Sequence, residues 1–138
     1  MMKNLILVVM GLIMMVGCNE KKAVDMLSGE WTVVSIEEGD VPASAGAFLG
    51  FDTVEKVVYG STGCNQLTGA MPVDVNGSDL LFGALGCTRR MCADMSVEDA
   101  MLPALGKVVD FKIEGDALSL LDAEGNTVIA LQKRQKAQ

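Results

Sequence analysis

Short segments rich in β-forming residues, separated by turn-forming residues, constrain this chain more than any other feature. In the C-terminal third, Phe111 and Ile113 alternate with charged residues, and the turns at Gly115-Asp116 and Glu124–Asn126 precede two β-rich segments, 117–121 and 127–132. Further strands are expected at residues 31–36, 47–51 and 56–59, with a hairpin over 71–82 that turns at Asn76-Gly77. A run of hairpins with one polar face each predicts an antiparallel sheet that is solvated on one side.

One helix is expected among these strands. Ser96 to Asp99 has the form of a capping box, and it places Glu98 near the positive end of the helix dipole. Apolar residues then recur at helical spacing and should face the core: Val97, Met101, Ala104, Leu105 and Val108. Pro103 lies inside this stripe and removes one backbone hydrogen bond, so either a kink or a shorter helix is expected.

The first 17 residues differ from the rest of the chain. Lys3 precedes an apolar run over residues 5–16, after which Gly17 and Cys18 lead abruptly into polar residues. The run is too short to cross a membrane comfortably, because a spanning helix needs about 20 residues. It also lacks the amphipathic stripe of a buried core helix, which is the alternative. The pattern therefore predicts a secretory signal peptide over residues 1–17.

Met15-Val16-Gly17-Cys18 resembles the lipobox of bacterial lipoproteins, although leucine is usual where Met15 stands. The resemblance implies that Cys18 carries a lipid anchor with acyl chains such as palmitate and becomes the mature N-terminus. Such chains hold a protein on a membrane with about 0.8 kcal/mol per buried methylene. Residues 18–26 would then be a lipidated tether, and the domain would lie in the bacterial envelope, in the periplasm or at the cell surface.

Charge and composition exclude several classes of function. Without Lys3 the chain has 10 Lys and Arg against 18 Asp and Glu, a net charge of −8. This balance argues against binding to nucleic acid or to an anionic membrane surface, because both need clustered basic residues. The absence of histidine removes the commonest general base and the nucleophile–histidine pair. Carboxylates can still do acid/base work, so this absence alone does not exclude an enzyme, but we predict that the protein is not one and that it has no cofactor.

A glycine-rich segment, Gly60 to Asn65, is the most distinctive in the chain. Its glycines, together with Gly69, would permit tight turning or positive φ around Cys64. The Asn65 side chain could hydrogen-bond its own neighbouring backbone in an Asx-type turn. A second distinctive segment, Cys87 to Cys92, follows ahead of the expected helix.

These two segments resemble the META-domain family of small HslJ-like envelope proteins, in which a Gly-Cys-Asn turn is followed by Thr-x-x-x-Cys ahead of a helix. The matching residues are Gly63, Cys64, Asn65, Gly69, Thr88 and Cys92. The resemblance covers residues 27–133 and leaves a polar tail at 134–138. It implies an α+β fold, a compact antiparallel sheet or partly closed barrel with one helix packed against it. It implies no catalytic residues and a loose link to stress tolerance or secretion.

Two pairings of the cysteines compete. If Cys18 is acylated, three cysteines remain in an oxidising compartment. The family pattern pairs Cys64 with Cys92, which would contribute about 3–4 kcal/mol by loop closure. The pair Cys87–Cys92 closes a shorter loop and would stabilise less. Three thiolates without histidine also make a poor zinc site, so no metal is expected.

On the family pairing, Cys87 remains a free thiol beside Arg89 and Arg90. The two arginines could lower its pKa and make it reactive, whereas a buried or inert cysteine is the simpler interpretation. For the arginines themselves, an internal salt bridge is expected rather than contact with an acidic partner.

Two functions remain open. The first is a non-catalytic, monomeric envelope lipoprotein that acts through binding or maintains the envelope under stress. The second is a small inhibitor or accessory subunit that docks on a larger envelope enzyme or complex through an exposed apolar patch. Residues 43–49 are a candidate for that patch, although they could equally lead into a strand. A hydrolase with paired carboxylates ranks last, because no spacing selects two acids that converge in a pocket.

Overall fold

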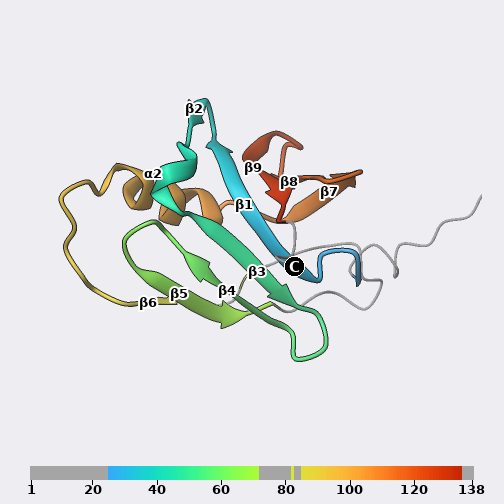
Figure 1. Cartoon of the computed structure of the whole chain (residues 1–138). Helices are drawn as coiled ribbons and strands as arrows, with labels where there is room; N and C mark the ends of the chain where they lie inside the picture. The colour runs from blue at the N-terminus through green and yellow to red at the C-terminus, as the bar shows by residue number, and fades with distance from the viewer. Residues whose placement is uncertain (1–24, 72–81, 83–84, 135–138) are drawn as a thin grey trace, which may run out of the picture.

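The computed structural model describes residues 25–71, 82 and 85–134 (Figure 1). Its strands are β1 (Gly29–Ile36), β2 (Gly39–Asp40), β3 (Phe48–Asp52), β4 (Val57–Ser61), β5 (Gln66–Ala70), β6 (Leu85–Cys87), β7 (Asp110–Glu114), β8 (Ala117–Leu121) and β9 (Thr127–Lys133). A short 3-10 turn, η2 (Ala43–Ala45), precedes β3, and one α-helix, α2 (Ser96–Leu105), separates β6 from β7.

The strands form one antiparallel sheet in the order β6-β5-β4-β3-β1-β9-β8-β7, and β2 pairs with β1 beside this path. In Figure 1, β7, β8 and β9 lie on one side of β1, and β3 to β6 lie on the other. Within the described residues the end strands β6 and β7 do not pair, so the sheet is open rather than closed into a barrel. The α+β class with one helix on an antiparallel sheet is confirmed.

The core lies where α2 packs against β1 and β9. The helical stripe points into it as expected, because Met101, Ala104 and Leu105 are all buried, and Val108 is buried just beyond the helix. Trp31 of β1 is 1% exposed, and its indole N–H donates a 2.8 Å hydrogen bond to the carbonyl of Leu27. These side chains join a single apolar cluster that also includes Val33, Leu49, Phe51, Val58, Leu67, Leu118, Leu120, Ile129 and Leu131.

The predicted capping box at the start of α2 is wrong. The N-cap is Met95, and no side chain caps it. Asp94 instead accepts hydrogen bonds from the backbone N–H and the hydroxyl of Ser96, at 2.9 and 2.6 Å. The Ser96 hydroxyl therefore bonds to Asp94, two residues earlier, instead of capping the helix. Pro103 lies in the last turn, and the helix ends at Leu105, which is the shorter of the two expected forms.

The expected strands at 31–36, 47–51, 56–59, 117–121 and 127–132 are confirmed to within two residues at their ends, as is the Phe111–Ile113 segment. The predicted hairpin turn at Asn76-Gly77 lies outside the described residues. The segment 43–49 does lead into a strand: after η2, Ala47 and Leu49 are buried, so these residues do not form an exposed apolar patch. Strands β5 and β6 were not predicted: β5 contains Gly69, which was assigned to turning, and β6 has only three residues, with a glycine at its centre.

Candidate functional site

The family-like residues meet at the turn between β4 and β5, which we call the signature turn (Thr62–Asn65). Gly63 has φ +98°, a conformation that strongly favours glycine. The turn is closed by the Thr62 N–H, which donates to the Asn65 carbonyl at 2.9 Å, and by the Asn65 N–H, which donates to the Thr62 hydroxyl at 3.0 Å. Both side chains are 1% exposed. Two buried polar side chains in one turn need partners, and these partners define the site.

The Asn65 amide reaches away from its own turn. Its oxygen accepts hydrogen bonds from the Thr88 hydroxyl at 2.9 Å and from the Arg90 N–H at 2.6 Å. Its nitrogen donates to the Arg90 carbonyl at 3.0 Å and to Oε1 of Glu98 at 2.8 Å. These four bonds use the full capacity of an amide side chain. The predicted Asx-type role is therefore wrong, because Asn65 links three segments that are distant in the sequence.

Glu98 brings α2 into this network. Its Oε1 also accepts a 2.6 Å hydrogen bond from the Thr62 hydroxyl. The bonds from Thr62 and then Asn65 hold the pKa of the Glu98 carboxyl below its ordinary value. A general acid near neutral pH needs a raised pKa, so this carboxylate is suited to holding the turn rather than to proton transfer. The sequence indicated only its favourable place near the helix N-terminus.

The signature glycines have separate roles. The prediction that Gly60 and Gly69 permit turning is wrong, because they lie inside β4 and β5. At Gly60 a Cβ atom would lie 2.2 Å from the Phe48 carbonyl oxygen, so glycine is required by the close approach of β3. Thr88 extends the sheet beyond β6, since its hydroxyl accepts from the Gln66 N–H and its own N–H donates to the Gln66 carbonyl, each at 3.0 Å.

A disulfide joins Cys64 to Cys92 across a sequence separation of 28 residues, as the family pattern implies. Cys87 is outside this bond and half-buried. Burial, followed by the charge of Glu98, raises the pKa of its thiol despite the opposing effect of Arg89. The interpretation of Cys87 as a reactive thiolate is therefore not supported. Among the described residues, neither Arg89 nor Arg90 forms an ion pair, so the expected salt bridge stays a prediction.

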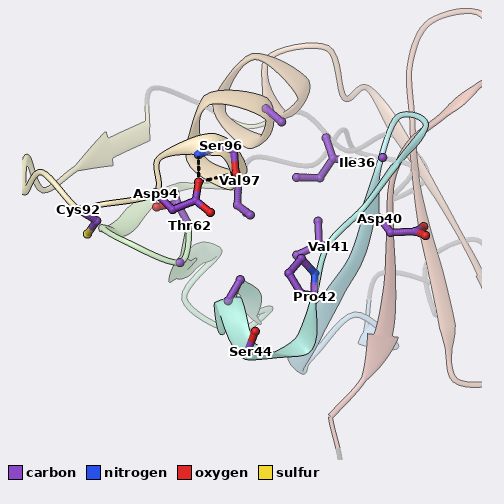
Figure 2. Close-up of a pocket in the computed structure, with 14 residues that line it drawn as sticks. Ile36, Asp40, Val41, Pro42, Ser44, Thr62, Cys92, Asp94, Ser96 and Val97 are labelled. Carbon is purple, nitrogen blue, oxygen red and sulfur yellow. Dashed lines mark hydrogen bonds between the residues drawn. The ribbon is translucent and has the colours of Figure 1, made fainter.

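A cavity of about 560 Å³ lies beside the signature turn (Figure 2). Val41 and Pro42 line one side, and Val97 of α2 faces them from the other. Part of its polar lining is engaged internally, because Thr62 donates to Glu98 and Ser96 bonds to Asp94; Asp40 and Ser44 also line it. The Ser96 hydrogen bonds lower the pKa of Asp94. The cavity therefore combines apolar surface from Val41, Pro42 and Val97 with polar groups that are partly engaged within the chain.

The described residues hold no group of three or more His, Cys, Asp or Glu side chains that could bind a metal ion. Their helices include none that is both long and apolar enough to cross a membrane. The site consists of the disulfide-linked signature turn and the cavity beside it.

Comparison with known proteins agrees with this fold. The fold and the site define a small antiparallel β domain, and in this chain a disulfide and a buried asparagine hold the signature turn beside α2. The chain matches the META domain over residues 24–135 and belongs to the META-domain family. No curated protein matches it.

Three solved structures share the fold. An NMR structure of a protein from Burkholderia xenovorans is 21% identical, with a TM-score of 0.64, covering 92% of this chain and 96% of that one. Another NMR structure is 19% identical, with a TM-score of 0.62, over 80% of this chain and 93% of the other. A DUF4847-family protein from Bacteroides vulgatus is 15% identical, with a TM-score of 0.57, over 80% of this chain and 96% of the other. At these identities the similarity shows the fold alone.

Proposed function

We propose that this META-domain protein is a non-catalytic, lipid-anchored envelope protein that acts by binding and helps to maintain the envelope under stress. The observation that carries the proposal is the internal use of the signature residues. Asn65 makes four hydrogen bonds and Glu98 accepts two, all within the chain. Polar groups that are already paired do not offer the free nucleophile or base that catalysis needs.

The cysteines support an exported protein. Disulfides persist in oxidising compartments such as the periplasm and are rare in the cytosol. The Cys64–Cys92 bond closes a long loop that begins in the signature turn. Removal of a native disulfide from a small domain typically lowers the free energy of unfolding by about 2–5 kcal/mol. A domain built on this bond is suited to the space outside the inner membrane, which agrees with the signal-like residues 1–17.

Labelling with palmitate tests the lipid anchor. Cells that express the wild-type protein, Cys18→Ser and Cys87→Ser are grown with labelled palmitate, and the protein is recovered and fractionated. We expect label and membrane association in the wild type and in Cys87→Ser, and neither in Cys18→Ser. Label that survives Cys18→Ser, or an unlabelled wild type, would contradict the anchor. Cys87→Ser is the matched control, because it also removes one thiol outside the disulfide.

The envelope role is tested separately in a deletion strain exposed to heat or detergent. We expect increased sensitivity that is restored by the wild-type gene and not by Cys18→Ser. Equal survival of the deletion and parent strains would contradict a role in envelope maintenance. Recovery of one stoichiometric protein with the intact chain would instead favour an accessory subunit of a larger envelope complex.

A further inference from the structure

A second hollow, of about 620 Å³, lies on the face of the sheet opposite the core, and we call it the outer-face groove. Strand alternation sets this face: Leu49, Val58 and Leu67 point into the core, so their neighbours along the strands point outward. The register places Tyr59 of β4 opposite Thr68 of β5, and both line the groove. The groove shares no lining residue with the cavity beside α2, and it meets the signature turn through Thr88, which bonds to Asn65.

Two aromatic rings form one wall of the outer-face groove. Phe48 and Tyr59 meet edge to face, with ring centroids 6.4 Å apart and planes at 77°. Gly50 lies under the tyrosine ring, and a Cβ atom there would be 2.2 Å from Cζ of Tyr59. A side chain at position 50 would thus displace the ring, so this glycine allows Tyr59 to lie against the sheet.

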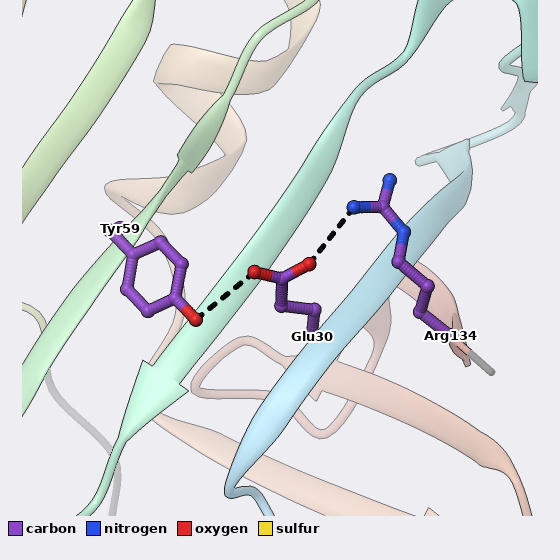
Figure 3. Close-up of polar contacts among 3 residues, drawn as sticks. All are labelled: Glu30, Tyr59 and Arg134. Carbon is purple, nitrogen blue, oxygen red and sulfur yellow. Dashed lines mark hydrogen bonds and ion pairs between the residues drawn. The ribbon is translucent and has the colours of Figure 1, made fainter. Parts of the chain in front are cut away.

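Polar bonds hold the Tyr59 ring in place (Figure 3). Its hydroxyl donates to Oε2 of Glu30 at 3.2 Å, and Nη1 of Arg134 donates to Oε1 of the same carboxylate at 3.0 Å. The Arg134 guanidinium also lies over the Phe48 ring, 4.3 Å from its centroid. Burial and the charge of Glu30 raise the pKa of Tyr59, so the hydroxyl remains protonated. The aromatic wall is therefore fixed in advance, and the two charges behind it neutralise each other.

The rest of the lining is uncharged and consists of four polar residues, two glycines, Leu67 and Cys87. Gln66 and Thr68 of β5 are exposed, Ser61 at the end of β4 adds a hydroxyl group, and Thr88 just after β6 adds another that is already bonded to Asn65. Gly86, opposite Thr68, lacks a side chain that would fill the hollow. None of the residues that line the groove carries a charge, in a chain that has 18 acidic and 11 basic residues.

We propose that the outer-face groove binds an uncharged oligosaccharide. A sugar ring has an apolar face that can stack on an aromatic wall and a rim of hydroxyl groups that match amide and hydroxyl side chains. An anionic ligand would find no cation in the lining. A purely apolar ligand would bury the Gln66 amide and the Thr68 hydroxyl without partners, at a cost in free energy. The inference rests on the proposed binding role of the domain and gives that role a ligand class.

The test is an NMR titration of the purified, isotope-labelled protein in a detergent that has no sugar headgroup. Two neutral tetrasaccharides, one of N-acetylglucosamine and one of glucose, are compared with an acidic tetrasaccharide of uronic acid. We expect amide shifts centred on Tyr59, Gln66 and Thr68 with a neutral sugar, at a Kd of about 1 mM. The neutral sugar that binds more tightly shows whether the source is an amino-sugar strand or a plain glucan.

Three variants separate the contribution of the aromatic wall from that of the polar lining. Tyr59→Ala should weaken binding by about tenfold or more, and Gln66→Ala by about threefold. Ser44→Ala, in the cavity beside α2, should leave the Kd unchanged. Gln66 is exposed, so its variant tests the proposal even if Tyr59→Ala does not fold.

Absence of shifts with both neutral sugars, shifts outside the groove, or tighter binding of the acidic sugar would overturn the proposal. The titration is independent of palmitate labelling, so failure of one leaves the other interpretable.

Discussion

The core under α2 and the signature turn are both buried, but different forces hold them. Beneath α2, apolar side chains from the helix, β1 and β9 exclude water, and Trp31 and Met101 are almost fully covered. At the signature turn, the buried residues Thr62 and Asn65 are polar, and hydrogen bonds and a disulfide take the place of apolar packing. Buried polar groups stabilise a fold only when they are fully paired.

This difference explains what the family signature means in this chain. The residues of the core can exchange with other apolar residues of similar volume at modest cost. An asparagine with four geometrically defined partners cannot be replaced in this way. The Gly-Cys-Asn pattern therefore stands out in the sequence because it builds the turn, and no chemistry has to be invoked to account for it.

The largest effect is expected from the apolar region. Trp31→Ala should lower the free energy of unfolding by about 4–5 kcal/mol, because it removes a buried ring and leaves a cavity. Urea denaturation followed by circular dichroism measures the change. Trp31→Phe is the control: it keeps a ring but loses the bond to the Leu27 carbonyl, and it should cost less. Equal losses in the two variants would mean that the hydrogen bond, rather than packing, dominates here.

The disulfide should rank second. The double variant Cys64→Ser/Cys92→Ser should lose about 3–4 kcal/mol of unfolding free energy, since the unfolded chain is no longer closed into a loop. The same denaturation experiment, with and without reductant, measures it. The wild type should approach the double variant under reduction, and Cys87→Ser should respond to reductant as the wild type does. If the free energy of unfolding of the wild type were the same with and without reductant, the polar network alone would hold the turn.

The asparagine should rank third. Asn65→Ala should cost about 2–3 kcal/mol, because it leaves the Arg90 backbone groups and the Thr88 hydroxyl without their partner. The neighbouring substitution Gln66→Ala, at an exposed position, should change stability little. Hydrogen exchange would add a local measure, with faster exchange at the Arg90 amide in Asn65→Ala. Unchanged protection at that amide would contradict the role assigned to the asparagine.

The two regions also differ in how far the sequence predicted them. The apolar region follows from periodicity: the helical stripe and most strands were predicted within two residues of their positions. Alternation and 3.6-residue spacing report burial directly, because both depend on which face meets water.

The signature turn was predicted only in part. The family pattern implied the disulfide, yet the bonds of Asn65 to Thr88 and Glu98 span 23 and 33 residues, and no local pattern encodes such distances. The role of each glycine could not be read from the sequence for the same reason. Gly63 adopts a positive φ, whereas Gly60 allows the close approach of β3. The outer-face groove was not predicted at all, since its wall depends on strand register and on the Glu30–Arg134 pair.

The smallest expected effect concerns the charge of Glu98. Its pKa is lowered in the folded state by the Thr62 and Asn65 hydrogen bonds, so it adds stability only while it is ionised. In Glu98→Gln an amide oxygen can still accept both bonds, and the charge-dependent part alone is lost. The difference in unfolding free energy between wild type and variant should be fully present at neutral pH and shrink as pH falls below about 4.3, the ordinary glutamate pKa.

Denaturation midpoints measured between pH 7 and pH 3 test this dependence on pH. The control is Glu124→Gln, at an exposed position in the turn between β8 and β9, which removes the same charge away from the signature turn. The difference in unfolding free energy between wild type and Glu98→Gln could instead grow as the pH falls. That result would reverse the sign of the linkage and show that the folded protein prefers a protonated carboxyl. The predicted sign instead means that the turn is tied to α2 most firmly at neutral pH and loosens in acid, whereas the apolar core beneath the same helix has no such dependence.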